Sequence, residues 1–273
     1  MSMSYRLREA TLPVLPPDHQ PIRVLHFSDL HLTPSRRREI ADIKSFAALK
    51  PDLVISTGDF LADKDAVPVV LDALEGLLHL PGLFVFGSND YYSPRAKNPL
   101  SYLFKDHGKR VLGDLLPVEE LRSGLVQHGW RDLNHHRATL TIKGTTIEFR
   151  GTDDAHLNRD DYSTIAGAPG DCDLAVGVTH APYLRIIKSM SRDQLDVIFA
   201  GHTHGGQVRL PWPGGSRALT TNCDLPTWRA RGVTRVAGEP WLNVSAGMGT
   251  SPFARMRVAS PPEVSLITLE SSL

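Results

Sequence analysis

Three short apolar runs separated by two helical segments occupy most of the first 90 residues, and they limit the folds open to the chain. The runs at 22–27, 53–55 and 83–86 have the length and residue types of buried strands. The segments at 37–49 and 67–80 carry apolar residues at helical spacing. Alternating strands and helices are typical of a parallel sheet covered by helices, so we expect an α/β fold.

The remaining residues predict shorter elements of both kinds. Residues 138–142 and 146–150 alternate in polarity around Lys143-Gly144, which indicates a β-hairpin. Helices are expected at 119–128 and 183–190, and strands at 174–178, 197–200, 207–210, 233–236, 241–244 and 264–269. No internal repeat or linker separates these elements. We therefore expect one domain, 1–273, with two sheets, an extended lead-in at 1–21 that could hold an edge strand at 5–11, and a long excursion at 91–117 near the active site.

The charge balance argues against a nucleic-acid binder. Lys plus Arg and Asp plus Glu both number 30, whereas such proteins normally carry a basic excess. The basic runs 36–38 and 109–110 are interpreted as solvated surface.

Two cysteines, Cys172 and Cys223, do not make a disulfide framework and fit a reducing compartment, although one bridge would be compatible. With no secretory signal pattern and no apolar run of transmembrane length, we expect a cytoplasmic protein.

Five polar loops each follow directly on a predicted strand. In open α/β sheets, ligands bind beyond the carboxyl ends of the strands, so these loops should converge on one crevice. The loops are Asp29-Leu-His31, Gly58-Asp59, Gly87-Ser-Asn-Asp90, Thr179-His180 and Gly201-His-Thr-His204.

Taken one at a time, these loops could be ordinary turns with a capping Asp or a surface His. Taken together, they supply seven side chains with metal-binding atoms: Asp29, His31, Asp59, Asn89, His180, His202 and His204. Imidazoles combined with carboxylates suit Mn, Fe, Zn or Ni better than Ca or Mg alone. Seven donors are too many for one tetrahedral ion but enough for two ions, which is the usual arrangement for in-line displacement at phosphorus.

The order of these motifs resembles that of the calcineurin-like metallophosphoesterases. The stretch Gly201-His-Thr-His-Gly-Gly-Gln207 and the segment 244–250 are similar to one bacterial branch, the YaeI/YkuE-like phosphodiesterases. The resemblance implies a four-layer α-β-β-α sandwich of two mixed sheets flanked by helices. It also implies a phosphoesterase, in the first place a phosphodiesterase, with two divalent metal ions, of which manganese is favoured.

The resemblance further implies a role for each position. The first ion would be held by Asp29, His31 and His204. The second would be held by His180, His202 and the amide of the third motif, with Asp59 shared by both. A hydroxide between the ions would attack phosphorus, and the residues closest to this chemistry would be Asp59, Asn89 and His204.

The third motif departs from the family pattern, which reads Gly-Asn-His-Asp where this chain has Gly-Ser-Asn-Asp. Aligned without a gap, Ser88 takes the place of the amide ligand. We favour Asn89 instead, because an amide oxygen is the better donor to a hard cation. The histidine that assists the leaving group is then missing, and His156 and His107 are candidate replacements unless both are surface residues.

Further polar and aromatic residues near these loops have two interpretations each. Asp90 is expected to orient its loop rather than to bind metal. The cluster Asn222-Cys-Asp224 could line the crevice or form a simple turn. Either Arg209 or Arg217 could contact substrate phosphate or belong to the surface. The pair Tyr91-Tyr92 could stack on substrate or serve packing.

Two alternatives to a phosphodiesterase belong to different functional classes. One is a scaffold that keeps the fold without activity, and the other is a metal-dependent nuclease. The expected partner is a phosphate ester, which a membrane-bound lipid could carry. Peripheral contact with the inner face of a membrane, through residues 5–15 or the excursion, is a further hypothesis.

Overall fold

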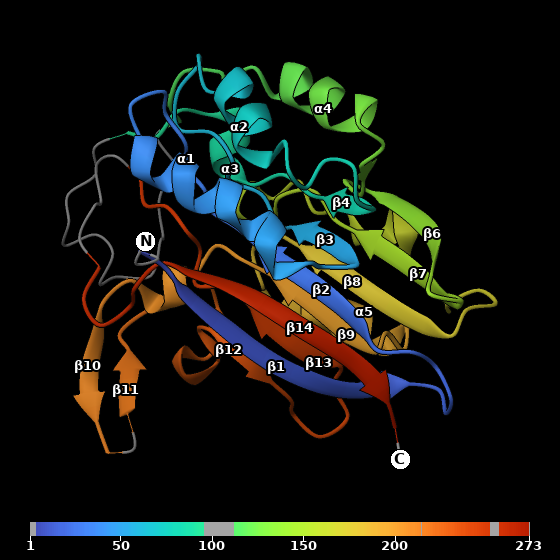
Figure 1. Cartoon of the computed structure of the whole chain (residues 1–273). Coiled ribbons are helices and arrows are strands. Elements are labelled where there is room, and N and C mark those ends of the chain that lie inside the picture. The colour runs from blue at the N-terminus through green and yellow to red at the C-terminus, as the bar shows by residue number, and fades with distance from the viewer. Residues whose placement is uncertain (1–3, 96–111, 214, 252–256, 273) are drawn as a thin grey trace.

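Two six-stranded sheets form the centre of the computed structural model, which describes residues 4–95, 112–213, 215–251 and 257–272 (Figure 1). The first sheet has the order β1 (Arg6–Leu15), β14 (Glu263–Ser271), β2 (Ile22–Phe27), β3 (Leu53–Ser56), β4 (Gly82–Phe84) and β5 (Arg131–Asp132). The second has the order β12 (Gly232–Thr234), β13 (Trp241–Val244), β9 (Val197–Ala200), β8 (Leu174–Thr179), β7 (Thr145–Gly151) and β6 (His136–Ile142). Each sheet combines parallel with antiparallel pairs, so both are mixed.

Helices cover the outer face of each sheet. On the first sheet lie α1 (Arg37–Lys44), α2 (Val67–Leu74) and α4 (Val118–Gln127), and on the second lies α5 (Leu184–Arg192). The strand β2 shows how one sequence serves two layers. Leu25 and Phe27 pack against the helices, whereas Ile22 and Val24 face the second sheet, because successive side chains of a strand alternate between faces. The expected four-layer α-β-β-α arrangement is confirmed.

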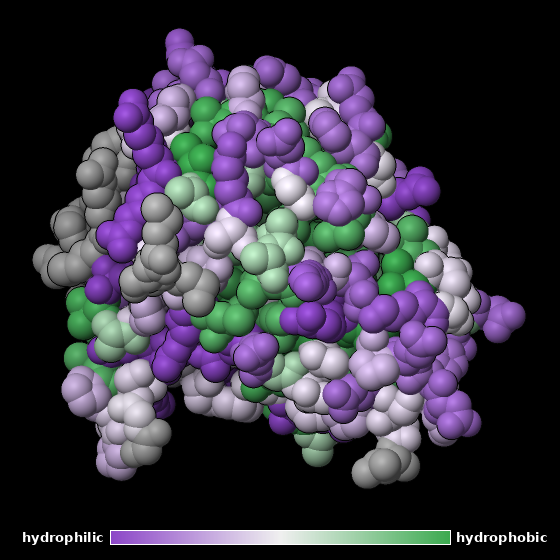
Figure 2. All heavy atoms as spheres, viewed as in Figure 1, coloured by the Kyte–Doolittle hydropathy of each residue, from purple (hydrophilic) through white to green (hydrophobic). Residues whose placement is uncertain are grey.

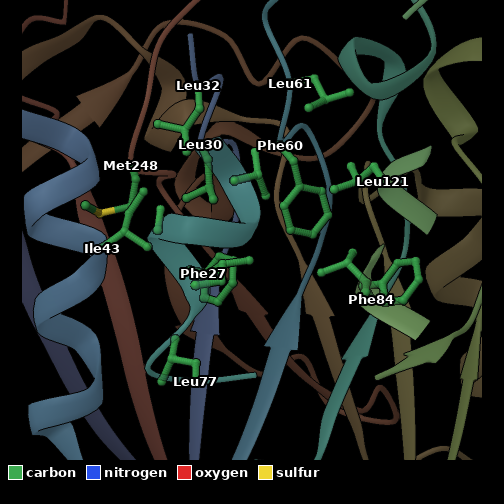
Figure 3. Packing of buried hydrophobic residues seen from close by; sticks show 14 of the residues in the cluster. Phe27, Leu30, Leu32, Ile43, Phe60, Leu61, Leu77, Phe84, Leu121 and Met248 are labelled. Carbon is green, nitrogen blue, oxygen red and sulfur yellow. The ribbon is translucent and has the colours of Figure 1, made fainter. Parts of the chain in front are cut away.

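Apolar packing holds the covering helices against the first sheet. Figure 3 shows Ile43 of α1 beside Met248, with Phe27, Phe60 and Phe84 in the same layer. Each side chain of this size stabilises the fold by about 1.5–3 kcal/mol when it is fully buried. The loop residue Phe60 directly follows Asp59, so core packing begins one residue beyond a predicted metal ligand.

Several elements differ from the prediction in their ends. The helix expected at 37–49 continues beyond Lys44 as a 3₁₀ helix, Ser45–Leu49, before Pro51. The helix expected at 67–80 ends at Leu74, close to Gly76, because glycine is the weakest helix former after proline. Strand β11 (Gly215–Ala218) was not predicted, since its Gly-Ser-Arg-Ala sequence has low strand propensity. It forms by pairing with β10 (Arg209–Trp212).

The lead-in contributes the edge strand β1, which runs four residues beyond the predicted end at residue 11. It pairs in parallel with β14 from the other end of the chain, and Pro13 is tolerated because the strand lies at an edge. Cys172 and Cys223 are both free, so they form no bridge. None of the described helices has the length and apolarity needed to span a membrane. Most of the excursion at 91–117, including His107, lies outside the described residues.

Candidate metal centre

Loops after β2, β3, β8 and β9 bring five of the predicted ligands together at one edge of the two sheets. One donor atom each from Asp29, His31 and His204 lies within 4.8 Å of the others. A second group with the same spacing consists of Asp29, Asp59 and His180. The two groups come from segments up to 175 residues apart in the sequence, so only the fold can assemble them.

Asp29 belongs to both groups, and Asp59 of the second group also reaches the first. Its Oδ2 atom is 3.6 Å from Nε2 of His31 and 3.6 Å from Nε2 of His180. The carboxylate therefore faces an imidazole of each group at once. Nε2 of His204 completes the surroundings of the first group, 3.5 Å from Oδ1 of Asp29 and 3.4 Å from Nε2 of His31.

The two remaining predicted ligands border the groups in different ways. Asn89 donates from its backbone nitrogen to Oδ1 of Asp59 and from its amide Nδ2 to Oδ2, both at 2.7 Å. The ring of His202 lies 5.2 Å from that of His180, and its Nε2 atom is 3.2 Å from the carbonyl oxygen of Asn222. Asn89 thus contacts the Asp59 carboxylate, while His202 lies beside His180 and contacts Asn222.

Left-handed backbone conformation is concentrated in these loops. Such φ values are uncommon in residues other than glycine, and each costs of the order of 1 kcal/mol, so they persist where the surrounding structure enforces them. Five predicted ligands adopt them: Asp29 (φ 53°), His31 (45°), Asp59 (56°), His202 (68°) and His204 (48°). The sharp turns that result point side chains from separate strand ends into one space.

Several buried polar atoms at the centre have no hydrogen-bond partner, as expected where a cation binds. Among the described residues these include Oδ1 of Asp29 and Nε2 of His180. Buried polar atoms of folded proteins are normally paired, so unpaired ones indicate room for a ligand. Carboxylate oxygens and imidazole nitrogens at this spacing are the donors that divalent transition metals take, so the residues present fit metal ions.

The electrostatics of the centre agree with this interpretation. Burial lowers the pKa of His31 to about 4, and it also lowers the pKa of His204, so both rings are in the neutral form that can coordinate a metal. Burial opposes a charge on His180, but the nearby carboxylates of Asp59 and Asp29 raise its pKa to about 9. The negative charge that raises this pKa is the charge that a metal cation would neutralise.

With this geometry established, comparison with known proteins identifies the family. Residues 22–206 match the calcineurin-like phosphoesterases. The chain belongs to this family. Members are metal-dependent phosphoesterases, and the donor groups above are residues that could hold the metal.

Individual relatives extend the match over most of the chain. YpbG of Bacillus subtilis is 26% identical over 91% of this chain and 81% of its own length. The UDP-2,3-diacylglucosamine pyrophosphatase LpxG of Chlamydia trachomatis is 27% identical over 90% of this chain and 83% of its own. The metallophosphoesterase YkuE of Bacillus subtilis is 23% identical over 95% and 82%. These relatives confirm the superfamily and the bacterial branch.

Hydrogen bonds outside the donor groups hold the loops of this phosphoesterase in place. The carboxylate of Asp90 accepts from the backbone nitrogens of Asp59, Phe60, Leu61 and Gly87, which confirms its expected orienting role. Nδ1 of His180 donates to the carbonyl oxygen of Thr57 at 2.6 Å, which leaves Nε2 directed at the centre.

A cavity of about 130 Å³ opens beside the donor groups. His156 lies in its wall, buried, with its ring 4.4 Å from that of His202 and its Nδ1 3.2 Å from the hydroxyl of Tyr183. The alternative that His156 is a surface residue is therefore wrong. Other lining residues include Ser88, Arg95, Gln207, Asn222 and Ser251.

The remaining candidates divide between packing and the cavity. Tyr91 is buried and donates to Oδ1 of Asp153, which fits packing rather than stacking on substrate. Asn222 lines the cavity, whereas Asp224 accepts from the backbone nitrogen of Leu184 at the start of α5. The guanidinium of Arg209 donates to Gly205 and Ser216 rather than facing the cavity.

Sequence reasoning missed Arg257 as a neighbour of the centre. Its Nη2 atom lies 3.1 Å from Nδ1 of His204, and Nη1 donates to the carbonyl oxygen of Ala246. Burial lowers its pKa to about 10. No sequence pattern marks this arginine, because it lies in a C-terminal segment without periodicity and reaches the centre only through the fold.

Proposed function

We propose that this chain hydrolyses phosphodiester or pyrophosphate bonds at a centre of two divalent metal ions. The observation that carries the proposal is the position of Asp59, whose carboxylate lies 3.6 Å from an imidazole nitrogen of each donor group. One ion would be held by Asp29, His31 and His204, and the other by His180, His202 and Asn89, with Asp59 shared. Two such ions supply Lewis acidity and lower the pKa of water.

The third motif bears on this assignment through Asn89. Its amide nitrogen donates to Asp59, and a half-turn of the amide group exchanges nitrogen and oxygen without moving the side chain. The oxygen would then face the centre as a ligand. This supports Asn89 over Ser88, because the Asn89 side chain already contacts the carboxylate proposed to be shared.

The chain's own residues would also position the substrate and supply a proton. We propose that His156, in the cavity wall, protonates the leaving-group oxygen in place of the histidine that the third motif lacks. Arg95 lines the same cavity and carries a positive charge that would attract the phosphate group.

The substrate class is proposed from a relative. LpxG of Chlamydia trachomatis is named for pyrophosphate hydrolysis of a diacylated nucleotide sugar, and it matches 90% of this chain. A phosphate ester or pyrophosphate attached to a lipid is therefore our preferred substrate. We further propose manganese as the favoured ion and the cytoplasmic face of a membrane as the place of action.

The experiment measures metal content and hydrolysis together. Metal-free protein would be loaded with Mn, Fe, Zn or Ni, its content determined by mass spectrometry, and turnover followed on bis-p-nitrophenyl phosphate and p-nitrophenyl phosphate. We expect about two ions per chain, faster diester cleavage, and a loss of at least about 1,000-fold in Asp59→Asn. The control Asp63→Asn changes a carboxylate that accepts from the nearby backbone nitrogen of Asp65, within its own turn.

Two results would replace the proposal by another function. Protein that binds no metal and turns over neither ester would be a scaffold. Faster cleavage of single-stranded oligonucleotides than of small diesters, with strong salt dependence, would indicate a nuclease.

A further inference from the structure

The hairpin of β10 and β11 stands apart from both sheets (Figure 1). Its strands pair antiparallel, with Leu210 opposite Arg217 and Trp212 opposite Gly215. Because side chains alternate along a strand, Leu210, Trp212 and Arg217 share one face of this ribbon. The guanidinium of Arg217 lies 5.4 Å from the centre of the Trp212 ring on that face.

This face of the hairpin is apolar and open to solvent. Leu210 is 50% exposed and Trp212 58%, and Leu219, next along the same face, is 43% exposed. Val258 continues the surface at 40%, since residue 258 pairs with Val208 at the foot of β10. These four make up half of the eight large apolar side chains that are exposed among the described residues. A concentration of this kind marks an interaction surface.

The opposite face is anchored to the wall of the metal centre. Arg209 is buried there and donates to the carbonyl oxygen of Gly205 and to Oγ of Ser216 at 2.8 and 2.9 Å. Gln207 before β10 and Thr220 after β11 both line the cavity beside the donor groups. The exposed apolar face therefore begins at the cavity and leads outward from it.

The charged side chains of the hairpin segment are all positive. From residue 205 to residue 222 the sequence contains Arg209 and Arg217 but no Asp or Glu. Figure 2 shows the projecting hairpin, at lower left, mostly in pale shades rather than deep purple. An exposed Trp and Leu accompanied by Arg217 on the same face complement a surface with an apolar interior and negative headgroups.

We propose that the β10–β11 hairpin docks this phosphoesterase on an anionic lipid bilayer, with Leu210 and Trp212 inserted at headgroup depth. A second protein is a poorer fit, because a stable protein interface needs about 800 Å² on each partner, whereas this ribbon has four residues in each strand and carries the charged Arg217 on the same face. A bilayer needs no matching shape, and Trp and Arg are favoured at its interface. Docking here would bring the cavity next to lipid headgroups.

The inference rests on the proposed function only for the choice of a lipid-borne substrate, since binding can be measured without hydrolysis. Full-length protein would be co-sedimented with phosphatidylcholine vesicles with and without phosphatidylglycerol, at low and high salt. We expect binding to anionic vesicles that weakens with salt. The double variant L210S/W212S should bind at least about tenfold more weakly, because the apolar contribution is lost. Arg217→Glu should reduce binding to anionic vesicles several-fold.

Matched substitutions away from the hairpin separate docking from general surface effects. Val126→Ser removes an apolar residue of similar exposure on α4, and Arg38→Glu reverses a charge on α1. Both should bind as the wild type does. Brominated lipids should quench the fluorescence of the wild type, and the conservative variant Trp212→Phe should bind normally while losing most of this quenching.

The outcomes for vesicle binding are distinguishable from the outcomes for hydrolysis. Hairpin variants should hydrolyse bis-p-nitrophenyl phosphate at the wild-type rate, and Asp59→Asn should bind vesicles normally. Absence of wild-type binding to anionic vesicles, or equal loss in Val126→Ser and L210S/W212S, overturns the proposal. A dimer in solution that L210S/W212S dissociates would show that a second copy covers this face, and it would also overturn the proposal.

Discussion

The carboxylate of Asp90 accepts a hydrogen bond of 2.8 Å from the backbone nitrogen of Asp59. The same oxygen accepts from Gly87, and the other accepts from Phe60 and Leu61. One buried side chain of the third motif thus fixes the backbone of the second motif, where the proposed shared ligand lies. Asp90 acts on the centre through Asp59, as a positioning residue.

Asp90→Ala should therefore weaken both the fold and the centre. Four buried backbone donors lose their acceptor, and we expect the free energy of unfolding to fall by about 3 kcal/mol. Urea unfolding monitored by circular dichroism measures this change, and mass spectrometry measures metal content. Asp63→Ala, in an exposed turn, should change stability by less than about 0.5 kcal/mol. Normal metal content in folded Asp90→Ala would contradict the positioning role.

Separate substitutions of Ser88 and Asn89, the two residues before Asp90, decide which of them is the metal ligand. Asn89→Ala should reduce the affinity for one of the two ions at least about tenfold, because the amide oxygen that would bind the metal is lost. Ser88→Ala should leave metal affinity nearly unchanged. Titration of metal-free protein with manganese, followed by calorimetry, gives both affinities. A larger loss in Ser88→Ala would move the ligand to Ser88.

Gly87 has a steric reason to lack a side chain. A Cβ atom there would lie 2.3 Å from Oδ1 of Asp59 and 2.6 Å from Cε1 of His180. Gly87→Ala should displace both side chains and reduce turnover of bis-p-nitrophenyl phosphate by about 100-fold or more. Gly170→Ala is the control, since its nearest contact would be an ordinary 3.4 Å to Glu148. Equal rates for the two variants would show that the centre tolerates the displacement.

His26 predicts a dependence of stability on pH. Burial lowers its pKa to about 3, and the ring is held neutral between Nδ2 of Asn243 at 2.7 Å and Oγ1 of Thr57 at 3.0 Å. The unfolded chain binds a proton near pH 6.5, whereas the folded chain does not until about pH 3. Stability should therefore fall as the pH decreases between these values, by up to about 1.4 kcal/mol per pH unit.

The test of the His26 prediction compares urea unfolding at pH 7 and pH 5, with chelator present so that metal binding does not contribute. His26→Gln lacks the titrating ring, so its stability should fall less over this interval than that of the wild type. Parallel changes in the two proteins would show that the folded ring accepts the proton.

The linear pattern of residues predicted most of the scaffold. Apolar runs identified β2, β3, β8 and β9 within one residue at each end, because buried parallel strands have continuous apolar sequences. The pattern failed where hydrogen-bonded pairing of strands outweighs the local strand propensity. Strand β11 has a Gly-Ser-Arg-Ala sequence and exists only because β10 lies beside it.

Residue type and order were also sufficient to nominate the donor atoms, because carboxylates and imidazoles placed directly after buried strands are the groups that bind transition metals. Their convergence depended on the folded chain. The left-handed turns at Asp29 and Asp59 point their side chains into the centre, and Arg257 contacts His204 from a segment with no distinguishing pattern. A one-dimensional pattern records which groups a strand end carries. The direction in which each group points depends on backbone dihedrals and long-range hydrogen bonds, which form only when the two sheets pack together.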